Sequence, residues 1–211
     1  KAITDSVSVN KIAREGEMPA SAFRVTSICV MVSLGSIGIG STSTEAAEPF
    51  RITSPTFKDG DVLPRKYGGI SPSNKNCIGE NVSIPLQWTA GPEATKSYVL
   101  MMVDLAGRMG AGVDHWLAYG IPANVTKLEE GAHSRAQDFI TGGTAGNETQ
   151  LYFGPCPAPG SGMHHYVITL VATDLAPGEL KAGMKRDELI KAIVGRGKAV
   201  TDMVLKQEYA P

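Results

Sequence analysis

Three side chains suited to acid–base or ligand-binding chemistry lie at the ends of apolar segments. Asp104 closes the segment SYVLMMVD, His115 opens HWLAYGI, and His164 stands just before another apolar run. A carboxylate can orient an imidazole ring, and imidazole N–H groups can donate hydrogen bonds to an anion. If the three segments are neighbouring strands, these side chains meet at one rim of a sheet. His133 differs from them, because it lies in an open loop.

Ser161 adds a catalytic alternative, since it lies in a Gly-Ser-Gly segment shortly before His164. Serine, histidine and aspartate can act together as nucleophile, base and orienting acid. The serine is not part of a G-x-S-x-G elbow between a strand and a helix, however, and Gly-Ser-Gly is typical of a turn. Two histidines and one aspartate could also ligate a metal ion. The simplest alternative is a hydrogen-bonded rim that only orders the strand ends.

The elements that must position these side chains are mostly short strands separated by turns rich in Gly and Pro. One helix is expected at Lys185–Val194, with Leu189, Ile190, Ile193 and Val194 on a common apolar face. The expected strands are Phe50–Phe57, Ile84–Trp88, Ser97–Val103, His115–Ile121, Tyr166–Ala172 and Asp202–Tyr209.

The composition favours one turn-rich β domain. The chain has 211 residues, and its 20 Lys and Arg nearly balance 21 Asp and Glu. This balance argues against a basic nucleic-acid-binding face and against a polyacidic tail. The 24 Gly and 13 Pro residues argue against a helical bundle, and many short strands with few helices predict a β-sandwich or barrel. The long polar loop from Gly131 to Tyr152 has a length that is often functional.

The first 48 residues differ from the rest and are expected to be an extension that contains a signal peptide. Arg24 precedes an uncharged run from Val25 to Thr44, whose apolar part is shorter than the ~20 residues that a membrane span needs. Small residues then offer a signal-peptidase site. We expect cleavage after Ala46, export to the periplasm or beyond, and a folded domain over residues 49–211. An uncleaved membrane anchor and a cytoplasmic tail are the alternatives.

The cysteines follow from this prediction of export. Cys29 lies in the signal region, which leaves Cys77 and Cys156 as an even pair in an oxidising compartment. Neither belongs to a C-x-x-C motif or has a histidine partner at metal-ligand spacing, so a zinc site is not expected. The pair can form a disulfide or remain as two small buried side chains.

Three separated motifs resemble those of the phosphatidylethanolamine-binding protein family, and most closely its bacterial Raf-kinase-inhibitor-like branch. The first is CIGENVSIPLQW, which begins at Cys77. The second is Asp104 followed by Asp114-His115-Trp116, and the third is YFGPCPAPGSGMHHY, which ends at Tyr166. The resemblance extends from Phe50 to Tyr209.

The resemblance implies a Greek-key-like sandwich of two antiparallel sheets with a few peripheral short helices, including one near the C-terminus. It also implies a small pocket for phosphate-like or acetate-like anions and phospholipid head groups. Six residues match the family's pocket motifs, and two aromatic residues beside the histidines are expected as pocket walls. These ligand-binding candidates are Asp104, His115, Trp116, Tyr152, Gly154, Pro157, His164 and Tyr166.

Two departures from the family pattern concern charges near this pocket. The family's D-P-D-A-P reads here as DLAGR, from Asp104 to Arg108, so that Ala106 replaces the second acid. The family's H-R-Y reads as H-H-Y, which begins at His164. If His115 and His164 both donate hydrogen bonds to an anion, binding should strengthen as the pH falls through about 6.5, the ordinary pKa of histidine.

We therefore expect a non-enzymatic, exported protein that binds small anions or phospholipid head groups. We expect no cofactor, no metal ion and no nucleic-acid partner. A regulatory role and a peripheral contact with a membrane are compatible with such a ligand. The alternatives are a secreted inhibitor that acts on a protein partner and, with less support, a Ser/His hydrolase.

Overall fold

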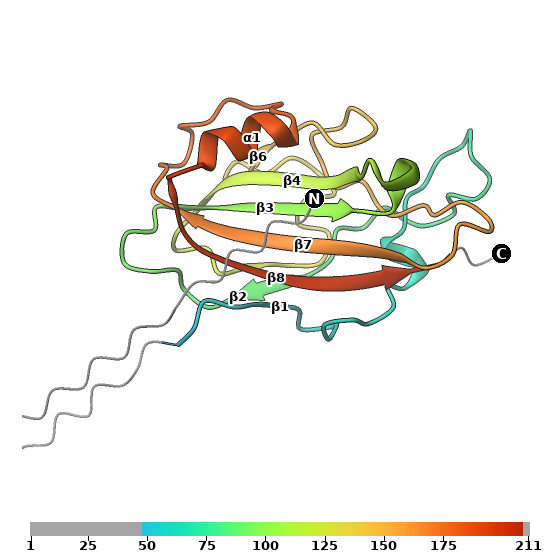
Figure 1. Ribbon diagram of the computed structural model, residues 1–211, viewed down its shortest axis with the longest axis horizontal. Helices are drawn as coiled ribbons and strands as arrows, with labels where there is room; N and C mark the ends of the chain where they lie inside the picture. The colour runs from blue at the N-terminus through green and yellow to red at the C-terminus, as the bar shows by residue number, and fades with distance from the viewer. Residues whose placement is uncertain (1–47, 209–211) are drawn as a thin grey trace, which may run out of the picture. The chain divides into compact units, whose positions relative to one another are not determined.

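The computed structural model describes residues 48–208, so the predicted signal peptide and cleavage site lie outside the described residues. Two antiparallel sheets form this part of the chain (Figure 1). The smaller sheet has the strand order β1-β2-β5, and the larger has the order β6-β4-β3-β7-β8. The predicted mainly β architecture of two antiparallel sheets with few helices is confirmed. The strands are β1 (Ile52–Thr53), β2 (Leu86–Trp88), β3 (Ser97–Asp104), β4 (Val113–Pro122), β5 (Lys127–Leu128), β6 (Thr141–Gly142), β7 (His164–Thr173) and β8 (Gly197–Gln207).

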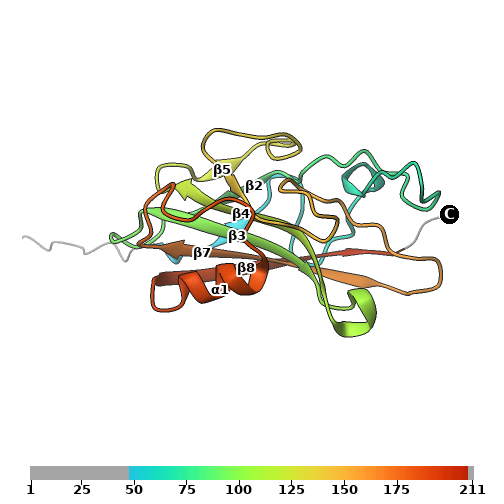
Figure 2. The ribbon, with the colours of Figure 1, turned by 90° about the horizontal axis from the view of Figure 1, so that it is seen from above.

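The main core lies between the two sheets, and a smaller one lies beneath the helix α1 (Arg186–Ile193). Strand β3 supplies both cores, because successive side chains of a strand point to opposite faces. Tyr98, Leu100 and Met102 belong to the main core, whereas Val99 belongs to the smaller one. Figure 2 shows α1 on the face of the larger sheet that is opposite to β2 and β5. Burial on both faces explains the almost wholly apolar sequence of β3.

Helix α1 begins and ends as its sequence predicts, but its buried face is narrower. The carboxylate of Glu188 accepts a hydrogen bond from the backbone N–H of Lys185, and Gly195 follows the helix with a φ of 75°. Leu189 is fully buried, whereas Ile190 and Val194 are 40% and 73% exposed. Of the predicted apolar face, Ile190 and Val194 are therefore left partly or largely exposed. They are displaced around the helix from the single stripe that contacts the sheet.

Prolines shorten the predicted N-terminal strands. The predicted strand Phe50–Phe57 is reduced to β1, and β2 begins only after Pro85. Proline has no backbone N–H to donate to a neighbouring strand. The hydroxyl of Ser54 instead donates a hydrogen bond to the carbonyl of Pro85. Strand β8 begins at Gly197, before the predicted start at Asp202, and pairs with β7 over its full length.

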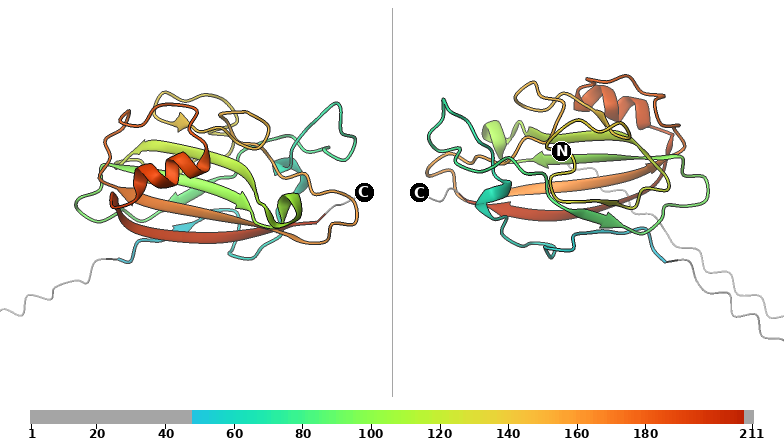
Figure 3. Two further views of the ribbon diagram at one scale, coloured as in Figure 1. Left: turned by 45° about the horizontal axis from the view of Figure 1, so that its top comes forward. Right: turned by 180° about the vertical axis from the view of Figure 1, so that it is seen from behind.

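Two short 3-10 helices complete the described residues, η1 (Arg65–Tyr67) and η2 (Gly107–Gly110). None of the helices within residues 48–208 is long and apolar enough to cross a bilayer. Figure 3 shows η2 at the end of the larger sheet where the loop before β7 also lies. This end of the sheet carries the candidate site.

Candidate functional site

The ends of β3, β4 and β7 meet at one edge of the larger sheet. Asp104 pairs with Val113 of β4 on one side and with Tyr166 of β7 on the other. His164 lies two residues before Tyr166, so its side chain is on the same inner face of the sheet. The sequence prediction that neighbouring strands bring Asp104, His115 and His164 to one rim is therefore correct.

A β-bulge places His115 in this group. The register of β3 and β4 passes from the pair Met102–Trp116 directly to the pair Val103–Asp114. His115 is therefore the extra residue on β4, and a bulge can redirect a side chain relative to strict alternation. The His115 ring packs edge-on against Tyr166 and is stacked on Phe153.

A pocket of about 710 Å³ opens at this rim. Five of the eight predicted ligand-binding residues line it: Asp104, His115, Pro157, His164 and Tyr166. The other lining residues are Ala106, Gly107, Arg108, Met109, Val113, Gly146, Phe153, Cys156, Ala158 and Ser161.

The remaining three candidates do not line the pocket, which corrects the sequence prediction. Trp116 is fully buried, and its indole N–H donates to Nδ1 of His133 at 2.7 Å. His133 is buried as well, although the sequence analysis expected it in an open loop. Tyr152 is buried and donates its hydroxyl to the carbonyl of Tyr67. Gly154 packs against the backbone at Tyr67, where a Cβ atom would be 2.5 Å from the carbonyl oxygen.

Asp104 and His164 form a buried hydrogen-bonded pair. Their exposed fractions are 4% and 9%, and His164 Nδ1 lies 2.6 Å from Asp104 Oδ2. The other carboxylate oxygen of Asp104 accepts the backbone N–H of Ala106. Both oxygens are thus used within the protein, and a buried carboxylate needs such partners.

Ser161 extends this chain of hydrogen bonds. Its hydroxyl lies 2.9 Å from Nε2 of His164 and donates to the carbonyl of Ala158 at 2.7 Å. One hydroxyl proton cannot serve both partners, so Nε2 of His164 must donate if both bonds form. Because Nδ1 already faces the Asp104 carboxylate, this pattern suits the imidazolium form of His164. In this arrangement the proton of the serine hydroxyl is directed to Ala158, and Nε2 does not act as its base.

His115 differs from His164 in the hydrogen bonds of its ring and in its protonation. Its Nδ1 lies 2.7 Å from the carbonyl of Phe153, which can only accept, so Nδ1 carries the proton. Burial lowers the pKa of His115 to about 4. The ring is therefore neutral near pH 7, and Nε2 presents a lone pair. At neutral pH His115 therefore offers an acceptor, and it could donate to an anion through Nε2 only once it is protonated.

Tyr166 offers the pocket a hydroxyl donor. Burial, and then the negative charge of Asp104, raise the pKa of Tyr166 well above its usual range, so the phenol stays protonated. Its ring is stacked against His164. Within residues 48–208 its hydroxyl makes no hydrogen bond, so it is free to donate to a ligand.

Arg108 is a lining residue that the sequence analysis did not select. It lies in the η2 turn between β3 and β4, and its Nη2 donates to the carbonyl of Gly146 across the pocket at 3.2 Å. The sequence signal was present, because Arg108 ends the segment that departs from the family's D-P-D-A-P pattern. Its relevance depends on a turn geometry that the segment alone does not disclose.

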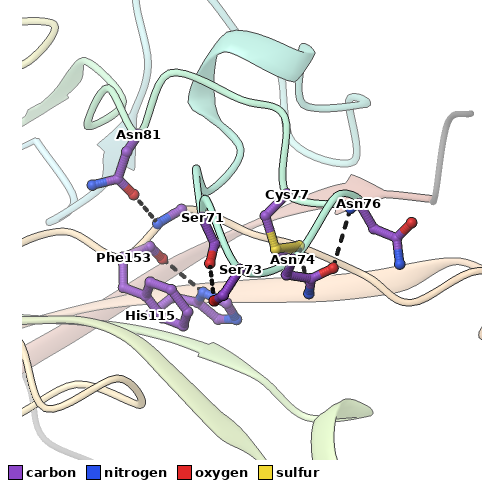
Figure 4. The surroundings of a disulfide bond; sticks show 10 residues. Ser71, Ser73, Asn74, Asn76, Cys77, Asn81, His115 and Phe153 are labelled. Carbon is purple, nitrogen blue, oxygen red and sulfur yellow. Dashed lines mark hydrogen bonds between the residues drawn. A yellow bond between two sulfur atoms is a disulfide. The ribbon is translucent and has the colours of Figure 1, made fainter.

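A disulfide and an asparagine hold the pocket's Pro-rich wall. Cys77 and Cys156 are joined, with their Cα atoms 5.3 Å apart, and Cys156 lines the pocket. The side chain of Asn81 accepts the backbone N–H of Gly154 at 2.7 Å and donates to the carbonyl of Tyr152. Figure 4 shows Asn81 and His115 each hydrogen-bonded to this segment, near the disulfide. Asn81 is a positioning residue that the motif contained but the sequence analysis did not single out.

No cluster of three or more His, Cys, Asp or Glu side chains that could hold a metal ion occurs among the described residues. The polar groups of the pocket are instead two histidines, one paired carboxylate, a phenol, a serine hydroxyl and a guanidinium. Such a set favours hydrogen bonding to a polar or anionic ligand.

Comparisons with known proteins give a consistent result. The family model described as "Phosphatidylethanolamine-binding protein" matches residues 53–206. A UPF0098 protein of Pyrococcus horikoshii is 31% identical over 175 residues, which cover 81% of this chain and 80% of the relative. The provisionally named lipoprotein LppC of Mycobacterium tuberculosis is 34% identical over 143 residues. That match covers 65% of this chain and 64% of the length of LppC.

A solved structure has the same fold. The crystal structure of Escherichia coli YbcL, described as a new member of the mammalian PEBP family, superimposes with a TM-score of 0.70. The match has 25% sequence identity and covers 77% of this chain and all of YbcL. Except for Gln207 at the end of β8, the larger sheet, its pocket and the Pro-rich wall lie within the residues that the family model matches.

Proposed function

Because the chain belongs to the phosphatidylethanolamine-binding protein family, we propose that its pocket binds a small phosphate-like anion or the phosphate of a phospholipid head group. The observation that carries this proposal is the buried Asp104–His164 pair beside two further donors, the Tyr166 hydroxyl and those N–H groups of Arg108 that do not bind Gly146. Donors that converge on a partly closed pocket are the usual means of holding an oxyanion.

A carboxylate in an anion site must first be neutralised. Asp104 meets this condition, because one oxygen faces the His164 imidazole and the other accepts the N–H of Ala106. The pair carries no net charge when His164 is an imidazolium. His115 contributes an acceptor at neutral pH, so it suits a hydroxyl, a protonated phosphate oxygen or an ammonium group of the ligand.

We propose that the protein does not convert its ligand chemically. Asp104, His164 and Ser161 stand in the order of a catalytic triad, and this geometry is the argument for a hydrolase. Against it, the hydroxyl of Ser161 donates to Ala158, and the serine lies in an exposed turn rather than at a strand–helix elbow. A serine whose proton is directed to a carbonyl is not activated by the neighbouring base.

The test uses a matched pair of neighbouring histidines. His164 points into the pocket, whereas the adjacent His165 is exposed on the other face of β7. Calorimetric titration with inorganic phosphate should show that His164→Ala weakens binding by ~1.5–3 kcal/mol, the scale of a hydrogen bond to a charged group. His165→Ala should leave the affinity unchanged. Equal affinities in all three proteins would refute the pocket assignment.

Ser161→Ala separates binding from catalysis. We expect this variant to change phosphate affinity by less than ~1 kcal/mol, since its hydroxyl already has a partner. Ester hydrolysis by the wild type that disappears in Ser161→Ala would establish the hydrolase instead.

The location and partners of the protein are part of the proposal. The name of LppC describes a lipoprotein, which is consistent with export of this relative. We propose that this chain is also exported and meets its ligand outside the cytoplasm, at a membrane surface when the phosphate belongs to a lipid. A protein partner would then compete with or depend on the ligand in the pocket.

A further inference from the structure

The turn that carries Arg108 has an unusual backbone. Arg108 and Met109 are consecutive non-glycine residues with φ values of 51° and 57°. L-amino acids seldom adopt this left-handed region, and its cost persists only where the surroundings fix it. Here Gly107 is packed so closely that a Cβ would meet both Val113 and the Asp104 carboxylate. The turn therefore fixes the position from which the guanidinium reaches over the pocket to Gly146.

The charges that face the pocket leave Arg108 uncompensated. Asp104 is paired with His164, and His115 is neutral near pH 7. Among the described lining residues, Arg108 is the one with a permanent positive charge. Asp114 lies within electrostatic range of Arg108, but it already forms a salt bridge with Arg186 at 3.2 Å. No other acid lines the pocket in the described part of the chain, since Ala106 stands at the second acidic position of the family motif.

We propose that Arg108 makes the pocket selective for phosphomonoester dianions over phosphodiester monoanions. This inference rests on the proposed anion-binding function and specifies its ligand class. Coulombic attraction scales with ligand charge, and a phosphomonoester carries about −1.5 to −2 at neutral pH. Its terminal phosphate also has three free oxygens. Two can bind the guanidinium side by side, and the third remains for the hydroxyl of Tyr166.

The experiment compares glycerol 3-phosphate with its methyl phosphodiester, a dianionic monoester and a monoanionic diester of similar size, by calorimetric titration of the full chain at neutral pH. The wild type should bind the monoester about tenfold more tightly. Arg108→Gln retains a polar side chain without charge, and it should reduce monoester affinity about tenfold while changing diester affinity much less. Arg51→Gln, an exposed arginine before β1, is the matched control and should behave as wild type.

The outcomes separate this inference from the function on which it rests. Equal wild-type affinities for the two ligands, or an unchanged preference in Arg108→Gln, would overturn the role of Arg108 but leave anion binding intact. Absence of binding to both ligands would overturn the anion-binding function itself. Cosedimentation with phosphatidylcholine vesicles that contain phosphatidic acid identifies the source. Binding that Arg108→Gln abolishes indicates a lipid phosphate, whereas binding of glycerol 3-phosphate alone indicates a soluble one.

Discussion

Two buried histidines make the stability of this protein depend on pH. Burial lowers the pKa of His115 and of His133 to about 4. The unfolded chain, with histidine pKa values near 6.5, therefore binds more protons than the folded one between these limits. The stabilisation is fully present above pH 6.5 and is lost as the pH falls towards 4. Protonation of His133 would also break its bond with Trp116.

Urea unfolding should detect this loss. Between pH 7 and pH 5 we expect each of the two histidines to contribute about 2 kcal/mol of destabilisation. His115→Gln keeps a polar side chain without the titration, so its stability should fall by about 2 kcal/mol less than that of the wild type over this interval. His165→Ala is the control and should keep the wild-type dependence. A His115→Gln variant with the full wild-type slope would contradict the neutral assignment of His115.

The site residues that lie at the ends of strands could be predicted from the sequence. Asp104 and His164 end or begin apolar segments, and antiparallel pairing of neighbours brings such ends together. Trp116 was misplaced because the bulge at His115 breaks the simple alternation of β4. Arg108 was missed because its contribution depends on a left-handed turn, which the sequence DLAGR does not specify for arginine.

At the scale of elements, the disulfide should stabilise the Pro-rich wall of the pocket. The cross-link between Cys77 and Cys156 closes a long loop, since the two cysteines have a sequence separation of 79. The double variant Cys77→Ser/Cys156→Ser should lose ~2–5 kcal/mol of unfolding free energy, because the unfolded chain regains conformational freedom. It should also bind phosphate more weakly, since Cys156 is part of the wall.

Reductant supplies the internal control for that measurement. Added reductant should lower the urea midpoint of the wild type towards that of the double variant and leave the double variant unchanged. Identical midpoints for wild type and variant under oxidising conditions would show that the cross-link does not stabilise the fold.

The central strands were predictable because each is a long apolar segment, with β3 buried on both faces and β7 buried at alternate residues. The strands of the smaller sheet were less predictable. Each has two or three residues and is stabilised by packing against the main core. Such short strands depend on tertiary contacts that no local pattern records. The same holds for β6, two residues within the loop predicted from Gly131 to Tyr152.

At the scale of the whole molecule, a nearly neutral chain can still hold a locally positive pocket. The formal net charge is −1, which alone would not indicate an anion site. The fold pairs Asp104 with His164, and Arg108 at the pocket has no carboxylate partner among residues 48–208. Net charge describes behaviour such as solubility and non-specific association, whereas a site depends on the placement of a few charges.

The mature form of an exported chain should lack the signal peptide. If the protein is exported and cleaved after Ala46, the intact mass of material recovered from the periplasm should correspond to a chain that begins at Ala47. This mass should also be lower than that of the reduced form by the mass of two hydrogen atoms, because Cys77 and Cys156 would be joined in an oxidising compartment. A lipid-modified N-terminal Cys29 would show that processing takes place elsewhere, as the name of LppC makes worth testing. Retention of Val25 to Ala46 without modification would contradict cleavage at this signal altogether.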